Sequence, residues 1–253
     1  MSSPLVLSLF PGIGLLDMAF EEAGFCVVRG PDLLWGGDVH RFHPPAGRFD
    51  GVIGGPPCQA FSRLRHIVEA NGYQTAPNLI PEYERIVAAA APAWFLMENV
   101  PAAPEPSVPG YKVRDSIIAD HWVGGVTGRE RRFSFGTALG QRLEIETLAL
   151  HVAEPEPAAL ASKGTAIVVA LGGSGKPKRS ATSALNTCRR NEGVVAEHLR
   201  KQGLPADFLD NCPLTVTGKI KVLGNGVPLA MGRAVAAAVC RAIGFEPGRE
   251  VAA

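Results

Sequence analysis

The sequence predicts an α/β protein whose mostly parallel sheet is covered by helices on both faces. Two observations support this prediction. Short apolar runs alternate with helical segments through residues 5–100, and Gly or Pro punctuates the boundaries between them. Apolar runs of this kind are typical of buried parallel strands, and their alternation with helices is typical of βαβ units.

The first strand and the first helix surround a glycine-containing turn. LVLSLF at residues 5–10 lies between two prolines, and we expect it to form a buried strand. PGIG at 11–14 turns the chain. GLLDMAFEEAG at 14–24 has apolar residues at helical spacing and ends at a glycine. FCVVR at 25–29 then predicts the second strand.

The next strands lead to two chemically distinctive positions. FDGVIGG at 49–55 predicts a strand that ends shortly before Cys58. PEYERIVAAAA at 81–91 predicts a helix with Pro in its first turn. AWFLMENV at 93–100 predicts a strand that ends on Glu98 and its neighbours.

After Pro101 the pattern changes. A proline-rich connector leads to two expected strands, YKVRDSIIAD at 111–120 and RRFSFGT at 131–137. Residues 137–180 are weakly patterned. GNGVP at 224–228 precedes a strongly apolar helix, which needs an existing core to pack against, so we expect it to return to the first domain.

Composition limits the possible functions. Of the 253 residues, 46% are apolar and 19% are charged, as in ordinary soluble proteins. The formal charge is only +1, so contact with a nucleic acid must depend on local basic patches. The five cysteines include no CxxC pair and no zinc-ligand spacing, which favours a reduced, cytoplasmic chain without a metal site. The amino-terminal apolar run is too short for a signal peptide or a membrane span.

Two features near the first turn suit a nucleotide-like ligand. FPGIG at 10–14 places glycines between a strand and a helix, which favours a backbone anion or nucleoside site, although structural turns use the same pattern. The spacing differs from GxGxxG and lacks the lysine of a P-loop. Asp32 and Asp38 follow the second strand, where an acid can bind ribose hydroxyls or an adenine amine, or can cap a turn.

GGPPCQAFS at 54–62 holds one thiol in a rigid turn at the carboxyl end of a strand. A reachable thiolate of lowered pKa is a strong carbon nucleophile, whereas most free cysteines are buried and inert. Glu98 ends an apolar strand, and burying a carboxylate there costs free energy unless the group is paired or has a function. We consider the case in which this strand neighbours the one that leads to Cys58. Cys58 and Glu98 could therefore flank one small heterocycle.

GRERRFSFG at 128–136 carries three arginines before a strand. Arg129 and Arg131 share one face of an extended segment and could clamp a carbonyl oxygen or a phosphate. A charged, solvated edge strand is the alternative reading.

Taken together, FPGIG, GDV, GGPPCQAFS, MENVP, GRERRFSFG and GNGVP resemble, in order, the motifs of the DNA cytosine-5 methyltransferase family. The resemblance covers nearly the whole chain. It implies a Rossmann-like S-adenosylmethionine-dependent methyltransferase fold with a small irregular recognition domain. It also implies transfer of a methyl group from S-adenosylmethionine to C5 of cytosine in DNA, as in restriction-modification systems.

The resemblance assigns roles residue by residue. Cys58 matches the nucleophile, Glu98 the acid at cytosine N3, and Arg131, with Arg129 behind it, the arginines at the cytosine carbonyl. The cofactor positions that it implies are Phe10, Gly12, Gly14, Asp32, Asp38, Pro57 and Asn225. The sequence departs from the family's pattern at GPDLLW (30–35), which replaces an acidic–aromatic pair, and at Thr127, which replaces Gln.

The implied domains are a catalytic, cofactor-binding domain at 1–136, a small target-recognition region at 137–221, and a returning carboxyl-terminal segment at 222–253. The recognition region is short, which suggests a short or loosely read DNA site. Candidate phosphate contacts are Arg63, Arg65, Lys176, Lys178, Arg179, Arg189 and Arg190.

The implied mechanism adds the Cys58 thiolate to C6 of a flipped-out cytosine, so that C5 becomes nucleophilic, and needs no metal. Polar residues 60–77 resemble the mobile loop that closes over the base. We expect a monomer without membrane contact, which acts on double-stranded DNA in the cytoplasm, at the nucleoid, of a bacterial or phage-infected cell.

Three alternatives remain open at this point. An RNA cytosine-5 methyltransferase would use the same chemistry, although PCQ favours DNA by resemblance. A catalytically silent DNA-binding homologue should have lost the nucleophile or the acid, and this chain keeps both. The third alternative is a nucleotide-dependent oxidoreductase, but its reaction would give Cys58 and Glu98 no catalytic role.

Overall fold

The structure, a computed structural model, describes residues 2–57, 61, 77–148, 154–160 and 181–246, and only the backbone of 181–191. The predicted nucleophile Cys58 and all but a few residues of the loop 60–77 lie outside this part of the chain. The same holds for the basic turn at 176–179 and for the side chains of Arg189 and Arg190.

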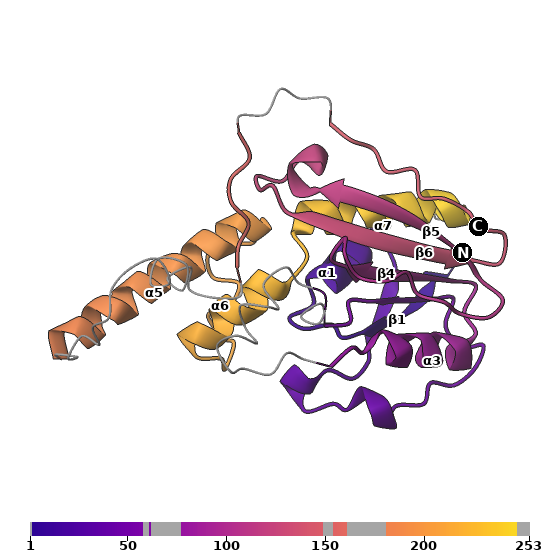
Figure 1. The fold of residues 1–253 in the computed structure, drawn as a ribbon, viewed down its shortest axis with the longest axis horizontal. Helices are drawn as coiled ribbons and strands as arrows, with labels where there is room; N and C mark the ends of the chain where they lie inside the picture. Colours follow the sequence, from indigo (N-terminus) through magenta and orange to yellow (C-terminus); the bar gives the residue numbers. More distant parts are fainter. Residues whose placement is uncertain (1, 58–60, 62–76, 149–153, 161–180, 247–253) are drawn as a thin grey trace.

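A six-stranded mixed sheet forms the centre of the protein (Figure 1). Four neighbouring strands are parallel, the fifth is antiparallel to the fourth, and the sixth is antiparallel to the fifth. The predicted mostly parallel α/β sheet is thereby confirmed. In spatial order the strands are β2 (Cys26–Arg29), β1 (Leu5–Leu9), β3 (Gly51–Gly54), β4 (Trp94–Asn99), β6 (Glu130–Thr137) and β5 (Lys112–Ala119).

Helices cover both faces of this sheet. α1 (Leu15–Glu22) and α7 (Leu229–Ile243) bury their apolar sides against one face, and α3 (Ile80–Ala90) packs on the other. Alternate strand residues serve the two faces, because successive side chains of a strand point to opposite sides. In β4, for example, Leu96 faces α7 and Phe95 faces α3.

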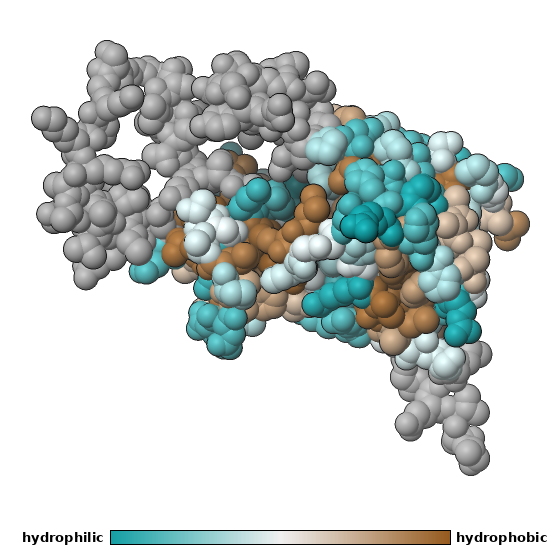
Figure 2. Space-filling view, turned by 90° about the horizontal axis from the view of Figure 1, so that it is seen from below, coloured by the Kyte–Doolittle hydropathy of each residue, from teal (hydrophilic) through white to brown (hydrophobic). Residues whose placement is uncertain are grey.

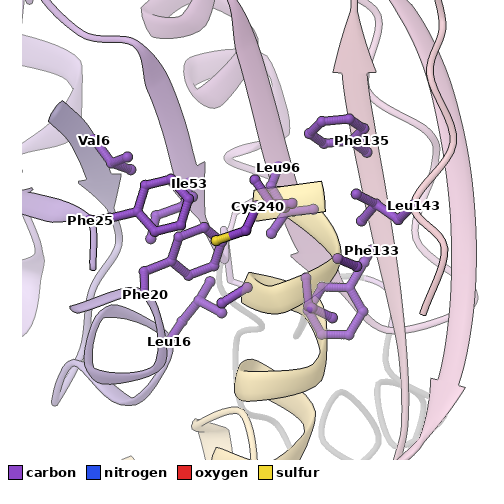
Figure 3. Packing of buried hydrophobic residues seen from close by; sticks show 14 of the residues in the cluster. Val6, Leu16, Phe20, Phe25, Ile53, Leu96, Phe133, Phe135, Leu143 and Cys240 are labelled. Atoms are coloured by element: carbon purple, nitrogen blue, oxygen red, sulfur yellow. The ribbon is translucent and has the colours of Figure 1, made fainter. Parts of the chain in front are cut away.

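Figure 3 shows the core on the α1 and α7 face, where aromatic rings from helix, strand and loop meet. The Phe20 ring lies with its centroid 5.1 Å from that of Phe25 and 6.2 Å from that of Trp94. Cys240 on α7 is buried in the same cluster. The apolar carboxyl-terminal helix thus shares a hydrophobic core with α1 and the first strands.

By length and composition alone the segment Val216–Ile243 could cross a membrane. Its apolar residues on α7, however, form part of the core, since Met231, Val235 and Val239 are completely buried. The segment is also two helices with Pro228 between them, not one continuous span.

Two helices were not predicted. α5 (Ala181–Gln202) extends away from the sheet (Figure 1), and α6 (Val216–Asn225) joins it to α7. Their apolar side chains form a third cluster with α1, to which Leu199, Leu223 and Leu15 contribute. The expected recognition region at 137–221 therefore contains helical structure in its last part. Short 3₁₀ helices complete the described fold: η1 (Leu33–Trp35), η2 (Val39–Arg41) and η4 (Asp120–Val123).

Candidate active site

A cavity of about 480 Å³ opens at the carboxyl ends of β1, β3 and β4. Ligands of open α/β sheets bind at this edge. One wall is the Phe10–Ile13 turn, a second is the 54–57 turn, and a third is the side of α6 that carries Lys221, Val222 and Asn225. Its volume falls within the range of roughly 300–1,000 Å³ that small-molecule sites occupy. Figure 2 shows apolar residues, in brown, gathered in the middle of one face between polar groups.

The first turn adopts a left-handed backbone at three positions. Phe10 has φ of 55°, Gly12 of 57° and Gly14 of 81°. Left-handed φ is unusual for a residue that is not glycine, and such strain is concentrated at functional sites. Phe10 and Gly12 line the cavity, whereas Gly14 does not. Gly14 is the N-cap residue of α1, and a Cβ there would lie 2.7 Å from Arg29 Nη2.

The two aspartates after β2 have different environments. Asp32 lines the cavity, and its carboxylate accepts hydrogen bonds from the amides of Gly12 at 2.8 Å and Leu34 at 2.7 Å. It therefore ties the glycine turn to η1. Asp38 is exposed and accepts from the His40 amide at 3.0 Å. Its neighbours on either side line the cavity, but Asp38 itself does not.

Glu98 and Arg131 meet in the wall of the cavity. Arg131 Nε lies 2.7 Å from Glu98 Oε1, and the two side chains are 13% and 11% exposed. Gly55 leaves room for this carboxylate, because a Cβ at Gly55 would lie 2.9 Å from Glu98 Oε2. The predicted acid and one predicted arginine are thus brought together.

The turn that leads to Cys58 lines the same cavity through Pro56 and Pro57. Asn99 fixes this turn to β4, since its Nδ2 donates to Pro56 O at 3.1 Å. Cys58 lies outside the described residues. The turn that leads to Cys58, however, lines the same cavity as Glu98.

Arg129 does not line the cavity, unlike Arg131. It is 6% exposed and donates hydrogen bonds to backbone carbonyls, among them Gly224 O at 2.9 Å. Asn225, the predicted cofactor residue at the end of α6, does line the cavity. Arg132 points elsewhere and donates to the carbonyls of Pro101 and Ala103, so it secures the turn that follows β4.

Sequence reasoning missed a buried acid at this site. Asp17 on α1 is 1% exposed, lines the cavity, accepts a hydrogen bond from Ser8 Oγ, and lies 3.0 Å from Arg29 Nε. Burial raises the pKa of the Asp17 carboxyl, partly offset by Ser8 and Arg29. The signal was an acid between apolar neighbours on the buried side of an amphipathic helix.

Among the described residues, no group of three or more His, Cys, Asp or Glu side chains could hold a metal ion. In the part of the chain that the structure describes, the charged side chains that line the cavity are three carboxylates (Asp17, Asp32 and Glu98) and two cations (Arg131 and Lys221). Two of these carboxylates have a cationic partner, since Glu98 is paired with Arg131 and Asp17 with Arg29.

Comparison with known proteins identifies a family model and several relatives. The model described as C-5 cytosine-specific DNA methylase matches residues 37–107. The Type II methyltransferase M.NgoPII of Neisseria gonorrhoeae is 34% identical over 116 residues, which cover 38% of this chain and 33% of that protein. The Type II methyltransferase M.HgiGI of Herpetosiphon aurantiacus is 32% identical over 118 residues, which cover 38% of this chain and 90% of that protein.

The chain spans about a third of the length of M.NgoPII and of a second relative, M.FnuDI of Fusobacterium nucleatum. Two solved structures share the fold. The S. pombe Dnmt2 methyltransferase has a TM-score of 0.59 and 14% identity, and the alignment covers 96% of this chain and all of that one. The Entamoeba histolytica methyltransferase EhMeth has a TM-score of 0.57 and 15% identity, with 96% and 99% covered.

Proposed function

Because the chain belongs to the C-5 cytosine-specific DNA methylase family, we propose that it transfers a methyl group from S-adenosylmethionine to C5 of cytosine in DNA. The observation that carries this proposal is the Glu98–Arg131 pair in a cavity that the Gly55–Pro57 turn also lines. The Glu98 carboxylate and the Arg131 guanidinium lie beside the turn that leads to the Cys58 thiol. Together these groups can contact one pyrimidine ring from several sides.

The cavity suits the cofactor in size and charge. S-adenosylmethionine, when bound, supplies an electrophilic methyl group on a sulfonium. Phe10, Gly12, Asp32, Pro57 and Asn225 line the cavity and would contact it. Asp38 and Gly14 do not line the cavity and would shape the turns beside the cofactor. The Asp32 carboxylate in the cavity wall adds negative charge that complements the sulfonium and the ammonium group.

The role of Cys58 follows from the electronic demand of the reaction. Cytosine C5 is too electron-poor to accept a methyl group directly. Addition of the Cys58 thiolate to C6 makes C5 nucleophilic, and after methyl transfer a base removes the C5 proton while the thiolate leaves.

Glu98 and Arg131 stabilise the charge that this addition creates. Glu98 would hold a proton at N3, and Arg131 would donate to the carbonyl oxygen of the ring, where negative charge grows. Their mutual contact keeps both groups at one point before the base arrives. Arg129 does not line the cavity, so it would support the Glu98–Arg131 pair indirectly and would not contact the base.

The target cytosine must leave the duplex, because C6 is unreachable within stacked bases. We further propose that the substrate is double-stranded DNA, that residues 137–221 read it, and that the protein acts as a monomer at the nucleoid.

Transfer of tritiated methyl from S-adenosylmethionine to DNA tests the proposal. We expect label in DNA with the unmodified protein and none with Cys58→Ser. Cys26→Ser is the matched control, because Cys26 is exposed on β2 and does not line the cavity. Equal label from Cys58→Ser would contradict the mechanism, and label in tRNA but not in DNA would contradict the substrate.

A further inference from the structure

The last turn of α6 is held by side chains from two other parts of the chain. A helix leaves its last four carbonyls without intrahelical partners. In α6 the Gly226 amide donates to the first two of these at 3.1 and 3.3 Å. Gln202 Nε2 also donates to the second, and Arg129 donates to the third at 2.9 Å and to the fourth at 3.4 Å. The four carbonyls belong, in order, to Val222, Leu223, Gly224 and Asn225.

The guanidinium that holds α6 also holds the recognition region. Arg129 Nη1 donates to Ala159 O at 3.1 Å, and Ala159 is 3% exposed. The carbonyl of Leu160 is bonded by His198 Nε2 of α5 at 2.8 Å. Ala159 and Leu160 both belong to the expected recognition region at 137–221.

Asp120 and Thr127 lie next to Arg129 and stabilise its position. Asp120 is completely buried and accepts from the Thr127 amide at 3.0 Å and from Thr127 Oγ1 at 2.7 Å. Asp120 also interacts electrostatically with Arg129. The negative end of the α6 dipole adds to the stabilisation of this buried cation.

Arg129 connects the end of α6, which lines the cofactor cavity, with Ala159 of the expected recognition region. Asn225, Gly226 and Val227, at the end of α6, line the cofactor cavity. Ala159 lies within residues 137–221, which we propose to read DNA. A displacement of either partner would change the hydrogen bonds of one shared guanidinium.

We propose that Arg129 is a positioning residue that couples DNA binding to cofactor binding, and that it does not touch the target cytosine. This inference rests on the proposed function and assigns Arg129 a different task from Arg131. Coupling between two sites is reciprocal, so DNA should tighten cofactor binding by the same factor by which the cofactor tightens DNA binding.

Isothermal titration of S-adenosylhomocysteine, with and without a duplex that carries a methylated site found by bisulfite sequencing, measures this coupling. In the unmodified protein we expect the duplex to lower the Kd for S-adenosylhomocysteine about fivefold or more. In Arg129→Lys we expect a Kd about tenfold weaker without DNA, and a ratio of the two Kd values close to one.

Two further variants separate coupling from structural support. Gln202→Ala removes a hydrogen bond to the end of α6 but leaves the bond from Arg129 to Ala159 intact. We therefore expect weaker binding of S-adenosylhomocysteine, with an unchanged ratio of the Kd values measured with and without the duplex. Arg114→Gln, an exposed arginine on β5, is the matched control and should change neither. Hydrogen exchange on the unmodified protein gives a test that needs no variant: addition of the duplex should slow exchange of the amides at 226 and 227.

An Arg129→Lys protein that keeps the ratio, or a duplex that leaves exchange at 226 and 227 unchanged, would overturn the inference. A selective loss of kcat in Arg129→Lys with normal coupling would show that Arg129 acts on the base instead. If the unmodified protein transfers methyl to DNA, these results refute only the inference. If it transfers none, the proposed function fails and the inference falls with it.

Discussion

The contact between Glu98 and Arg131 makes a quantitative prediction for a double-mutant cycle. Glu98→Gln keeps the shape of the side chain and removes its charge, and Arg131→Met removes the guanidinium without adding a new hydrogen-bonding group. The two side chains are 11% and 13% exposed, and the charged atoms lie 2.7 Å apart. Exposed pairs contribute about 0–1 kcal/mol, and breaking a fully buried pair costs about 3–5 kcal/mol.

This pair lies between those limits, so we expect a coupling of about 2 kcal/mol, or about 30-fold in the equilibrium constant. Urea unfolding of the unmodified protein, both single variants and the double variant measures it without cofactor or DNA. The double variant should be about as stable as either single variant. Additive costs, with a coupling below about 0.5 kcal/mol, would refute the reasoning.

Three further predictions concern the walls of the cavity. Arg85→Ala removes hydrogen bonds to two backbone carbonyls of the turn around η2; we expect a Kd for S-adenosylhomocysteine about fivefold weaker by isothermal titration, with kcat unchanged, and a lower kcat would count against this role. Gly54→Ala should cost about 1–3 kcal/mol in urea unfolding, because its Cβ would lie 2.6 Å from Leu9 O, which is backbone and cannot move aside. Gly193→Ala is the control, since nothing lies within 4 Å of its Cβ, and an equal loss in both variants would exclude the steric cause. Burial raises the pKa of Asp17 above its ordinary 3.8, so its contribution to stability is full below the unfolded pKa and is lost as pH rises through the folded pKa. Asp17→Asn removes this loss, so the stability of the variant relative to the unmodified protein should increase with pH across that window in urea unfolding at several pH values; a decrease would contradict the sign.

The parts of the fold that the sequence predicted have strong local signals. The apolar runs that end at Leu9, Gly54 and Asn99 are buried strands, and their alternation with helices determined the parallel part of the sheet. Because parallel strands end at one edge of a sheet, the sequence predicts that the residues that follow them lie near each other. Glu98 and Pro57 do line one cavity.

The parts that were not predicted depend on long-range contacts. α5 is polar over most of its length, and few of its residues, such as Leu199, join the hydrophobic core, so the sequence contains no apolar run that marks this helix. Gln202 bonds two carbonyls more than twenty residues further along the chain, and Arg129 bonds carbonyls at 159, 224 and 225. No local pattern records which distant backbone atom a side chain will reach.

The reversed direction of β6 has a consequence for how this site tolerates insertions. Arg131 lies at the beginning of its strand and Glu98 near the end of the neighbouring one, and they meet only because the two strands run in opposite directions. A slip of β6 by two residues would return every phenylalanine to the same face of the sheet, yet it would carry the guanidinium about 7 Å away from the carboxylate. Lengthening the hairpin between β5 and β6 could therefore yield a protein whose hydrophobic core is intact but whose Glu98–Arg131 contact is lost.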